Sequence, residues 1–150
     1  MDNLNISLAS DNERTWAAGI LSASEPWITL GVSYEKCLKN CNDPEYQIYV
    51  AHYEDKPAGF VILDMRGMAS SPYIKSIAVA PEYRNMKLGA EILKHAENAA
   101  RLTSKHMFLC VSSFNSRARH FYEKNGYEAV GELKDYIIRG ESEVIMHKRL

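Results

Sequence analysis

Residues 74–100, IKSIAVAPEYRNMKLGAEILKHAENAA, place an arginine, a short turn and a glycine between an apolar strand and a long helix. The apolar run at 73–80 ends at Pro81, which cannot donate to a strand ladder. The helix is expected over 86–105. Its apolar face is formed by Leu88, Ile92, Ala96, Ala99 and Ala100. A buried-looking strand at 107–113 follows, and a strand, a helix and a strand in that order predict a crossover between parallel strands.

The start of that helix is a possible phosphate site. The first turn of a helix carries N–H groups without intrahelical partners and the positive end of the helix dipole, so a pyrophosphate can bind there. Arg84 and Lys87 would add positive charge, and Gly89 would allow close approach of the ligand. Considered alone, the segment fits an ordinary capped turn with solvated charges equally well.

The rest of the chain alternates between predicted strands and helices. We expect a strand at 5–9, helices at 11–24 and 33–40, a β-hairpin formed by 46–54 and 59–66, and a helix at 116–124. Asn115 is placed to cap that last helix, and Asn125 and Gly126 to end it. The segments 127–133, 135–140 and 142–150 suggest a final antiparallel pairing. Together these elements predict a mixed α/β sheet with helices on both faces.

Length and composition indicate one soluble domain. The 150 residues are 46% hydrophobic and 25% charged with a net charge of −1, so we expect a single domain over 1–150 and neither a nucleic-acid nor a membrane partner. Residues 1–14 carry acidic and polar side chains where a secretory signal would be basic and then apolar. We therefore expect a cytoplasmic protein.

The cysteines and histidines do not suggest a metal or a disulfide framework. Cys37, Cys41 and Cys110 cannot all pair with one another, and reduced structural thiols are expected. The five histidines are scattered and form no His-Glu-x-x-His pattern. No metal site is predicted.

Two motifs in order give the strongest indication of function. Residues 84–89, RNMKLG, follow IAVAPEY, and about 25 residues later NSRA (115–118) precedes FYEKNGY (121–127). This sequence closely resembles the acetyl-CoA-binding motif and a second signature of the GNAT superfamily of N-acetyltransferases. The resemblance covers 46–150, and covers the first 45 residues only by the order of elements. Lys87 replaces the first glycine of the family pattern, and a helical backbone at that position would accept it.

The resemblance implies a fold of the α/β (α+β) class. It has a mixed, mostly antiparallel sheet of about seven strands, about four helices, and a splayed strand pair that forms the CoA cleft. Acetyl-CoA is the implied cosubstrate, with backbone groups of Ile77 and Val79 pairing with its pantetheine arm. The implied cofactor-binding residues are Ile77, Ala78, Val79, Arg84, Asn85, Met86, Lys87, Leu88, Gly89, Ala90, Asn115, Ala118 and Tyr122.

The resemblance also implies direct transfer of the acetyl group to an amine. The N–H of Val79 would contact the thioester oxygen, and Tyr122 would protonate the CoA thiolate, although Tyr122 also fits a core position. Cys110 occupies the position at which some relatives have a glutamate that acts as the general base. Glu25 is the substitute candidate for the general base, with a surface carboxylate as its alternative. A buried Cys110 thiol is more typical of inert packing than of an acetylated nucleophile.

The acceptor is not identified by any motif. We expect a small-molecule amine or a peptide, and Trp27, Tyr46, Tyr49, Tyr53 and Tyr73 are candidates for the pocket wall. The protein could be a monomer or a homodimer paired through its C-terminal strands. Two other functions remain open: a non-catalytic acyl-CoA-binding or sensory domain, and a nucleotide-binding module, which the absence of both common glycine-rich phosphate motifs disfavours.

Overall fold

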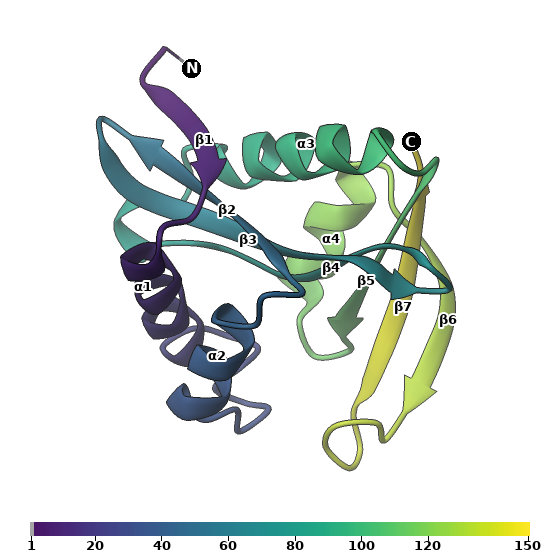
Figure 1. Ribbon diagram of the computed structural model, residues 1–150. Helices are drawn as coiled ribbons and strands as arrows, with labels where there is room; N and C mark the ends of the chain where they lie inside the picture. Colours follow the sequence, from purple (N-terminus) through teal and green to yellow (C-terminus); the bar gives the residue numbers. More distant parts are fainter. Residues whose placement is uncertain (1) are drawn as a thin grey trace.

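The computed structural model describes residues 2–150 and folds them around one seven-stranded sheet (Figure 1). The strands are β1 (Leu4–Leu8), β2 (Gln47–Tyr53), β3 (Lys56–Met68), β4 (Ser71–Val79), β5 (His106–Ser112), β6 (Glu128–Lys134) and β7 (Ser142–Arg149). The helices are α1 (Asp11–Ser22), α2 (Tyr34–Cys41), α3 (Leu88–Arg101) and α4 (Ser116–Lys124), with a short 3-10 helix η1 (Pro81–Tyr83) before α3. No helix in this described part is both long and apolar enough to cross a bilayer.

The order of strands across the sheet is β1-β2-β3-β4-β5-β7-β6. Every neighbouring pair is antiparallel except β4 and β5, which run parallel on either side of the α3 crossover. Those two strands pair only through Tyr73 with Phe108 and Ile74 with Leu109, and beyond that point they separate. The predicted mixed, mostly antiparallel sheet with a splayed strand pair is therefore confirmed.

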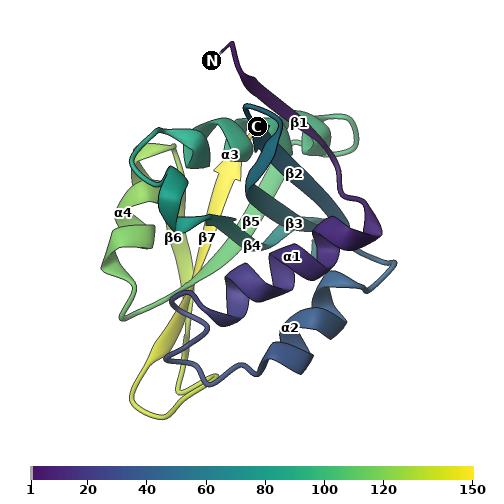
Figure 2. The same cartoon turned by 90° about the vertical axis from the view of Figure 1, so that its left-hand side faces the viewer.

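Helices cover both faces of the sheet (Figure 2), and the buried side chains form a separate apolar core on each face. On one face α1 and α2 pack over β2 and β3, with Leu21 and Cys37 buried against Phe60. On the other face α3 and α4 pack over the centre of the sheet, where Ile92 and Met107 are fully enclosed. The loop that follows α1 lies on the same side of the sheet, beside β4 and the end of β5.

The predicted element types agree with the structure, and the differences lie at turns. The hairpin turn between β2 and β3 is Glu54-Asp55. Both residues have positive φ, which lets a two-residue turn match the right-handed twist of the two strands. The expected helix at 86–105 begins only at Leu88, because Asn85 and Lys87 adopt left-handed backbone conformations, and it ends at Arg101 rather than at 105. Residues 135–140, expected to join the final pairing, form the turn between β6 and β7 instead.

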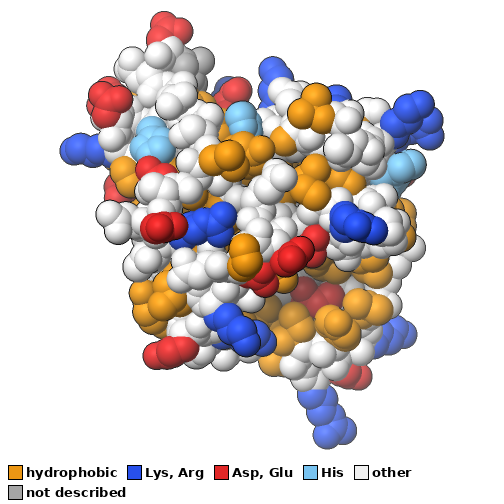
Figure 3. Space-filling view, in the orientation of Figure 1, with side chains coloured by type: hydrophobic (Ala, Val, Ile, Leu, Met, Phe, Trp, Pro, Cys, Tyr) orange, Lys and Arg blue, Asp and Glu red, His pale blue; other side chains and the backbone are white. Residues whose placement is uncertain are grey.

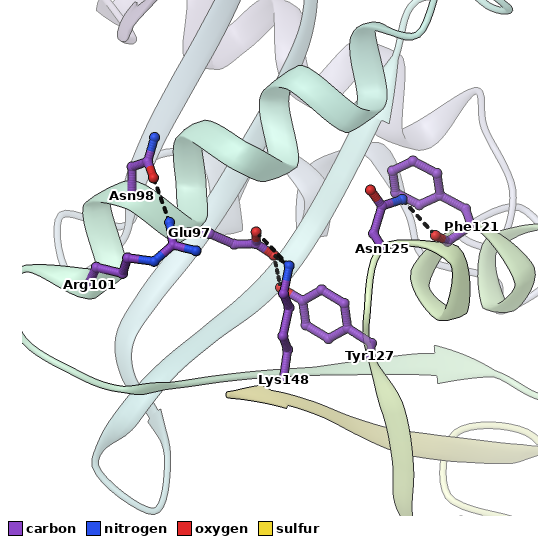
Figure 4. A network of polar contacts seen from close by, with 7 residues as sticks. All are labelled: Glu97, Asn98, Arg101, Phe121, Asn125, Tyr127 and Lys148. Carbon is purple, nitrogen blue, oxygen red and sulfur yellow. Dashed lines mark hydrogen bonds and ion pairs between the residues drawn. The ribbon is translucent and has the colours of Figure 1, made fainter. Parts of the chain in front are cut away.

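A buried polar network joins α3 to the C-terminal half of the sheet (Figure 4). Glu97 on α3 is 4% exposed, and Lys148 Nζ on β7 lies 3.0 Å from its Oε1. The hydroxyl of Tyr127 donates to Glu97 Oε2 at 2.9 Å. Burial, together with the nearby Glu97, raises the pKa of Tyr127, which keeps this phenol in its donating form. The buried negative charge of Glu97 is thus compensated by the ammonium group of Lys148 on the opposite side of the core.

The cysteine thiols are free, as expected from the sequence. Cys37 and Cys41 are buried in α2, and burial raises the pKa of Cys41 to about 11. Such thiols stay protonated at neutral pH and act as small apolar side chains.

Candidate active site

A cleft of about 720 Å³ opens where β4 and β5 separate. Its walls are β4, the end of β5, the start of α4, the loop after α1 and Glu143 of β7. Figure 3 shows this side of the molecule, with a recess in its lower half where hydrophobic and acidic side chains lie next to each other. The loop supplies apolar side chains to the cleft from Trp27, Ile28, Leu30 and Val32.

The edge of β4 that faces the cleft offers unused backbone groups. Ala80 donates its N–H to Ala58 O at 2.8 Å, so Ala80 points toward β3. Adjacent residues of a strand point their N–H groups to opposite edges, and Val79 pairs with Gly59 in the register of this ladder. The N–H of Val79, and that of Ile77 two residues before it, therefore face the gap between β4 and β5.

The N-terminus of α3 differs from those of the other α-helices in residues 2–150. Side chains cap α1, α2 and α4 through Ser10, Ser33 and Asn115, whereas Lys87 at the N-cap of α3 provides no side-chain hydrogen bond. The amides of the first turn of α3 are therefore available to an anion. Lys87 itself has φ 63° and ψ 15°. The expectation of a helical backbone at Lys87 is wrong, because the chain makes a left-handed turn there that favours glycine.

The cofactor-binding residues predicted from the sequence fall into two groups. Eight of them line the cleft: Ile77, Ala78, Val79, Arg84, Gly89, Asn115, Ala118 and Tyr122. The other five, Asn85, Met86, Lys87, Leu88 and Ala90, belong to the loop before α3 and its first turn and lie outside the cleft lining. The side chain of Leu88 is buried, so only its backbone could contact a ligand.

Contacts around the mouth of the cleft hold the loop and α4 together. Arg84 donates from Nε to Val79 O at 3.2 Å, which fixes its guanidinium beside the end of β4. Arg117 of α4 donates to Asn85 Oδ1 at 3.3 Å across the two segments. A Cβ on Gly89 would lie 3.4 Å from the ring of Phe121, so this glycine lets α3 and α4 pack closely.

Tyr122 lies on α4 and lines the cleft while being only 8% exposed. Its ring packs edge-on against Tyr127, and its hydroxyl makes no hydrogen bond to another described residue. Burial raises the pKa of Tyr122. The phenol is thereby kept protonated, which is the form that a proton donor needs.

Glu25 lies in the cleft wall, and its side chain also has a local partner. Its Oε2 accepts a hydrogen bond from the N–H of Thr29 at 3.4 Å. Of the aromatic residues proposed for the acceptor pocket, Trp27 and Tyr73 line the cleft. Tyr46, Tyr49 and Tyr53 do not: they pack under Lys75, against His95 and against Tyr83 respectively.

Several polar residues in the cleft were not selected from the sequence. They include Glu143 on β7, Ser112 on β5 and Arg117 on α4. Arg117 was part of the second motif and could have been noticed there. Glu143 and Ser112 meet only through the pairing of β5 with β7, which no local pattern reveals.

The family model described as "Acetyltransferase (GNAT) family" matches residues 10–127, which is most of the chain. The chain belongs to the GNAT acetyltransferase family. The resemblance inferred from the two motifs is thereby confirmed.

Individual GNAT relatives differ in what they acetylate. A 5-NmdU N-acetyltransferase of Pseudomonas phage PaMx11 is 29% identical over 85 residues, which cover 57% of this chain and 59% of the phage protein. The match thus spans less than two thirds of that relative. An N-alpha-acetyltransferase of Sulfurisphaera tokodaii is 23% identical over 125 residues, covering 67% of this chain and 75% of that protein.

The GNAT fold is shared over the full length of the described chain. A GNAT family acetyltransferase from Elizabethkingia anophelis, solved with acetyl-CoA bound, superposes with a TM-score of 0.78 at 19% identity. The comparison covers 100% of both chains. The expected fold of seven strands and four helices is confirmed in detail.

Proposed function

We propose that the chain is an enzyme that transfers the acetyl group of acetyl-CoA directly to a primary amine of a small molecule or a peptide. The observation that carries the proposal is the free backbone edge of β4, which faces the gap left by β5. An extended pantetheine arm can pair with such an edge as an added strand does. Family membership makes acetyl-CoA the acyl donor to test first.

The diphosphate of the donor would bind at the first turn of α3. That turn lacks a side-chain cap, and Gly89 carries no side chain that would hold a ligand away. Arg84 and Arg117 supply positive charge in the cleft wall. Lys87 can add charge from its own position at the N-cap. We therefore retain the loop residues Asn85 and Met86 as part of the proposed site.

The chemistry would take place between Val79 and Tyr122. The N–H of Val79 faces the gap and can donate to the thioester oxygen as negative charge develops on it. Tyr122, protonated and lining the cleft, can give its proton to the departing thiolate. The apolar loop around Trp27 would shield the reacting groups from water.

The acceptor is proposed at the level of a primary amine. The two relatives named above are a 5-NmdU N-acetyltransferase and an N-alpha-acetyltransferase, and both names state transfer of an acetyl group to nitrogen. A further solved relative, a nourseothricin acetyltransferase, is 28% identical over 71% of this chain, with a TM-score of 0.64 over 66% of its own. All three names describe an acetyltransferase, and two of them specify a nitrogen as the acceptor atom.

Calorimetric titration with acetyl-CoA tests the donor, with ADP and NAD as controls for generic phosphate binding. Tight binding of acetyl-CoA alone is expected, because the β4 edge recognises the pantetheine arm and not the nucleotide. Release of free thiol in the presence of amines then tests transfer. Equal affinity for the three ligands would contradict the proposed role of β4, and thiol release that no amine increases would contradict the transferase activity.

A further inference from the structure

Glu143 is the most enclosed carboxylate in the cleft. It is the second residue of β7. It is 9% exposed and lines the cleft wall. It forms no ion pair with a described residue. A buried carboxylate without a cationic partner is costly, so its retention in the wall of a cleft points to a cationic ligand.

Ser112 faces Glu143 across the β5–β7 ladder. Its Oγ is buried and has no hydrogen-bond partner among residues 2–150. The hydroxyl nevertheless lies close enough to favour the charged form of Glu143, although the two groups form no hydrogen bond of normal geometry. Glu143 is therefore left with one neighbouring hydroxyl and with no cationic partner among the described residues.

The charges around Glu143 come from several elements. Tyr73 on β4 and Cys110 on β5 are close enough to be influenced by its charge, and both are in their neutral forms because burial raises the pKa of each. The other charged side chains that line the same cleft are Glu25, Lys36, Lys75, Arg84 and Arg117. Lys75 is turned toward the ring of Tyr46, and Arg84 toward Val79 O. Neither is paired with Glu143.

We propose that Glu143 binds the ammonium group of the acceptor and takes its proton, with the buried hydroxyl of Ser112 beside it as the group that orients the carboxylate. This inference rests on the proposed function, because it assumes that an amine is acetylated in this cleft. Glu143 thereby takes the role of general base in place of Glu25, whose carboxylate accepts a hydrogen bond from the N–H of Thr29.

The proton count closes with Glu143 in this role. The ammonium nitrogen loses one proton to the Glu143 carboxylate, which passes it to solvent. Its lone pair then forms the N–C bond to the thioester carbon, and the C–S bond breaks. Tyr122 gives its proton to the departing thiolate, and the second proton, which leaves the nitrogen as the amide forms, returns to the Tyr122 phenolate. Burial raises the pKa of Glu143 and so makes it a stronger base than an exposed glutamate.

The surroundings of Glu143 restrict the class of acceptor. Ile28 and Ile137 are exposed hydrophobic residues that line the same cleft, together with Trp27. A carboxylate within an apolar rim suits a primary alkylamine that is cationic at neutral pH and carries an apolar group next to its nitrogen. A single enclosed carboxylate gives no added contact to further ammonium groups of a polyamine.

The test compares the wild type with Glu143→Gln, and uses Glu132→Gln as the matched control. Glu132 is an exposed carboxylate on β6 outside the cleft. Each protein is titrated with acetyl-CoA and then assayed by thiol release with three probe amines: phenethylamine, an alanine-initiated tripeptide and spermidine. The value of kcat/KM for the best probe is measured from pH 6 to pH 10.

Glu143→Gln is expected to lower kcat/KM at pH 7 by about 100-fold or more, the usual contribution of a general base, with acetyl-CoA affinity unchanged. The loss should shrink as the pH approaches the pKa of the free amine, because solution then supplies deprotonated acceptor. Glu132→Gln should match the wild type, and spermidine should not be preferred over phenethylamine.

The outcomes separate this inference from the proposed function. Wild-type turnover that survives Glu143→Gln with the same pH profile would overturn the role of Glu143 and leave the transferase intact. A wild type that binds acetyl-CoA but acetylates none of the probes would overturn both. A variant that loses acetyl-CoA binding would also overturn the assignment, since it would place Glu143 in the donor site.

Discussion

Lys148 on β7 and Glu97 on α3 form an ion pair of 3.0 Å across the core, with Tyr127 donating to the same carboxylate. Glu97→Gln would leave the Lys148 ammonium without its counter-charge in a largely enclosed site. We expect the free energy of unfolding to fall by about 2 kcal/mol, less than for a fully buried pair because Lys148 is partly exposed. Urea denaturation measures the change.

The exposed pair of Arg119 with Glu123 on α4 provides the comparison. Glu123→Gln should cost less than about 0.5 kcal/mol, because solvent-exposed pairs of this spacing contribute little. Equal losses for the two variants would mean that burial of the Glu97 network adds nothing to stability.

Tyr122→Phe should lower kcat about 100-fold or more while acetyl-CoA affinity stays within a factor of about two. The phenyl ring keeps the packing against Tyr127, and only the proton-donating hydroxyl is removed. Steady-state kinetics and calorimetry give the two numbers. Tyr136→Phe, at an exposed tyrosine of the β6–β7 turn, should leave both unchanged. An unchanged kcat in Tyr122→Phe would remove this residue from the proposed chemistry.

Lys87→Gly should stabilise the fold by about 1 kcal/mol, because glycine adopts the left-handed conformation at φ 63° without the clash of a side chain. Lys87→Ala keeps that clash and removes the same charge, so it should give no such gain. Thermal unfolding of the two variants separates backbone strain from charge. If alanine stabilised as much as glycine, the strain at Lys87 would be ruled out as the cause.

Glu143→Gln should make the free protein more stable at pH 7 even as it loses activity. Burial raises the pKa of Glu143 in the folded state, so the folded protein holds this proton more tightly than the unfolded chain does. The contribution of Glu143 to stability therefore falls as the pH rises from the pKa of the unfolded chain through that of the folded protein, and the penalty persists above it. Glutamine carries no such penalty.

Urea midpoints measured from pH 4 to pH 8 check this sign. The difference between Glu143→Gln and the wild type should be small at pH 4 and should grow in favour of the variant toward neutral pH. A wild type that gained stability relative to the variant over this range would show that Glu143 is not penalised by its surroundings.

Local signals in the sequence predicted the elements well where caps were present. Helix α4 has the predicted bounds, because Asn115 caps it and Asn125 and Gly126 end it. The start of α3 was predicted two residues too early, because the sequence gives no sign that Asn85 and Lys87 adopt left-handed backbone conformations. The apolar residues of 135–140 suggested a strand, yet the segment is a turn because the β6–β7 register leaves no partner for it.

The donor half of the candidate site was predictable and the acceptor half was not. Arg84 and Gly89 lie within the β4–α3–β5 crossover and Tyr122 lies in the second motif, on the helix α4 that follows β5, so all three were found from motifs. Glu143 comes into the cleft through its pairing with Ser112, a long-range register that depends on the whole sheet. Glu25 was chosen for its loop, and its contact with Thr29 is visible only in three dimensions.

The two pairs that join β4 to β5 are also a weak seam between two halves of the sheet. A ligand that lies along the free edge of β4 fills that seam and links the halves by its own contacts. Ligand binding to the folded state alone raises stability with ligand concentration. Amide exchange should therefore slow on both sides of the seam, and protease resistance should increase, in proportion to occupancy. The supply of acyl donor would then set the resistance of the protein to unfolding and proteolysis as well as its rate of turnover.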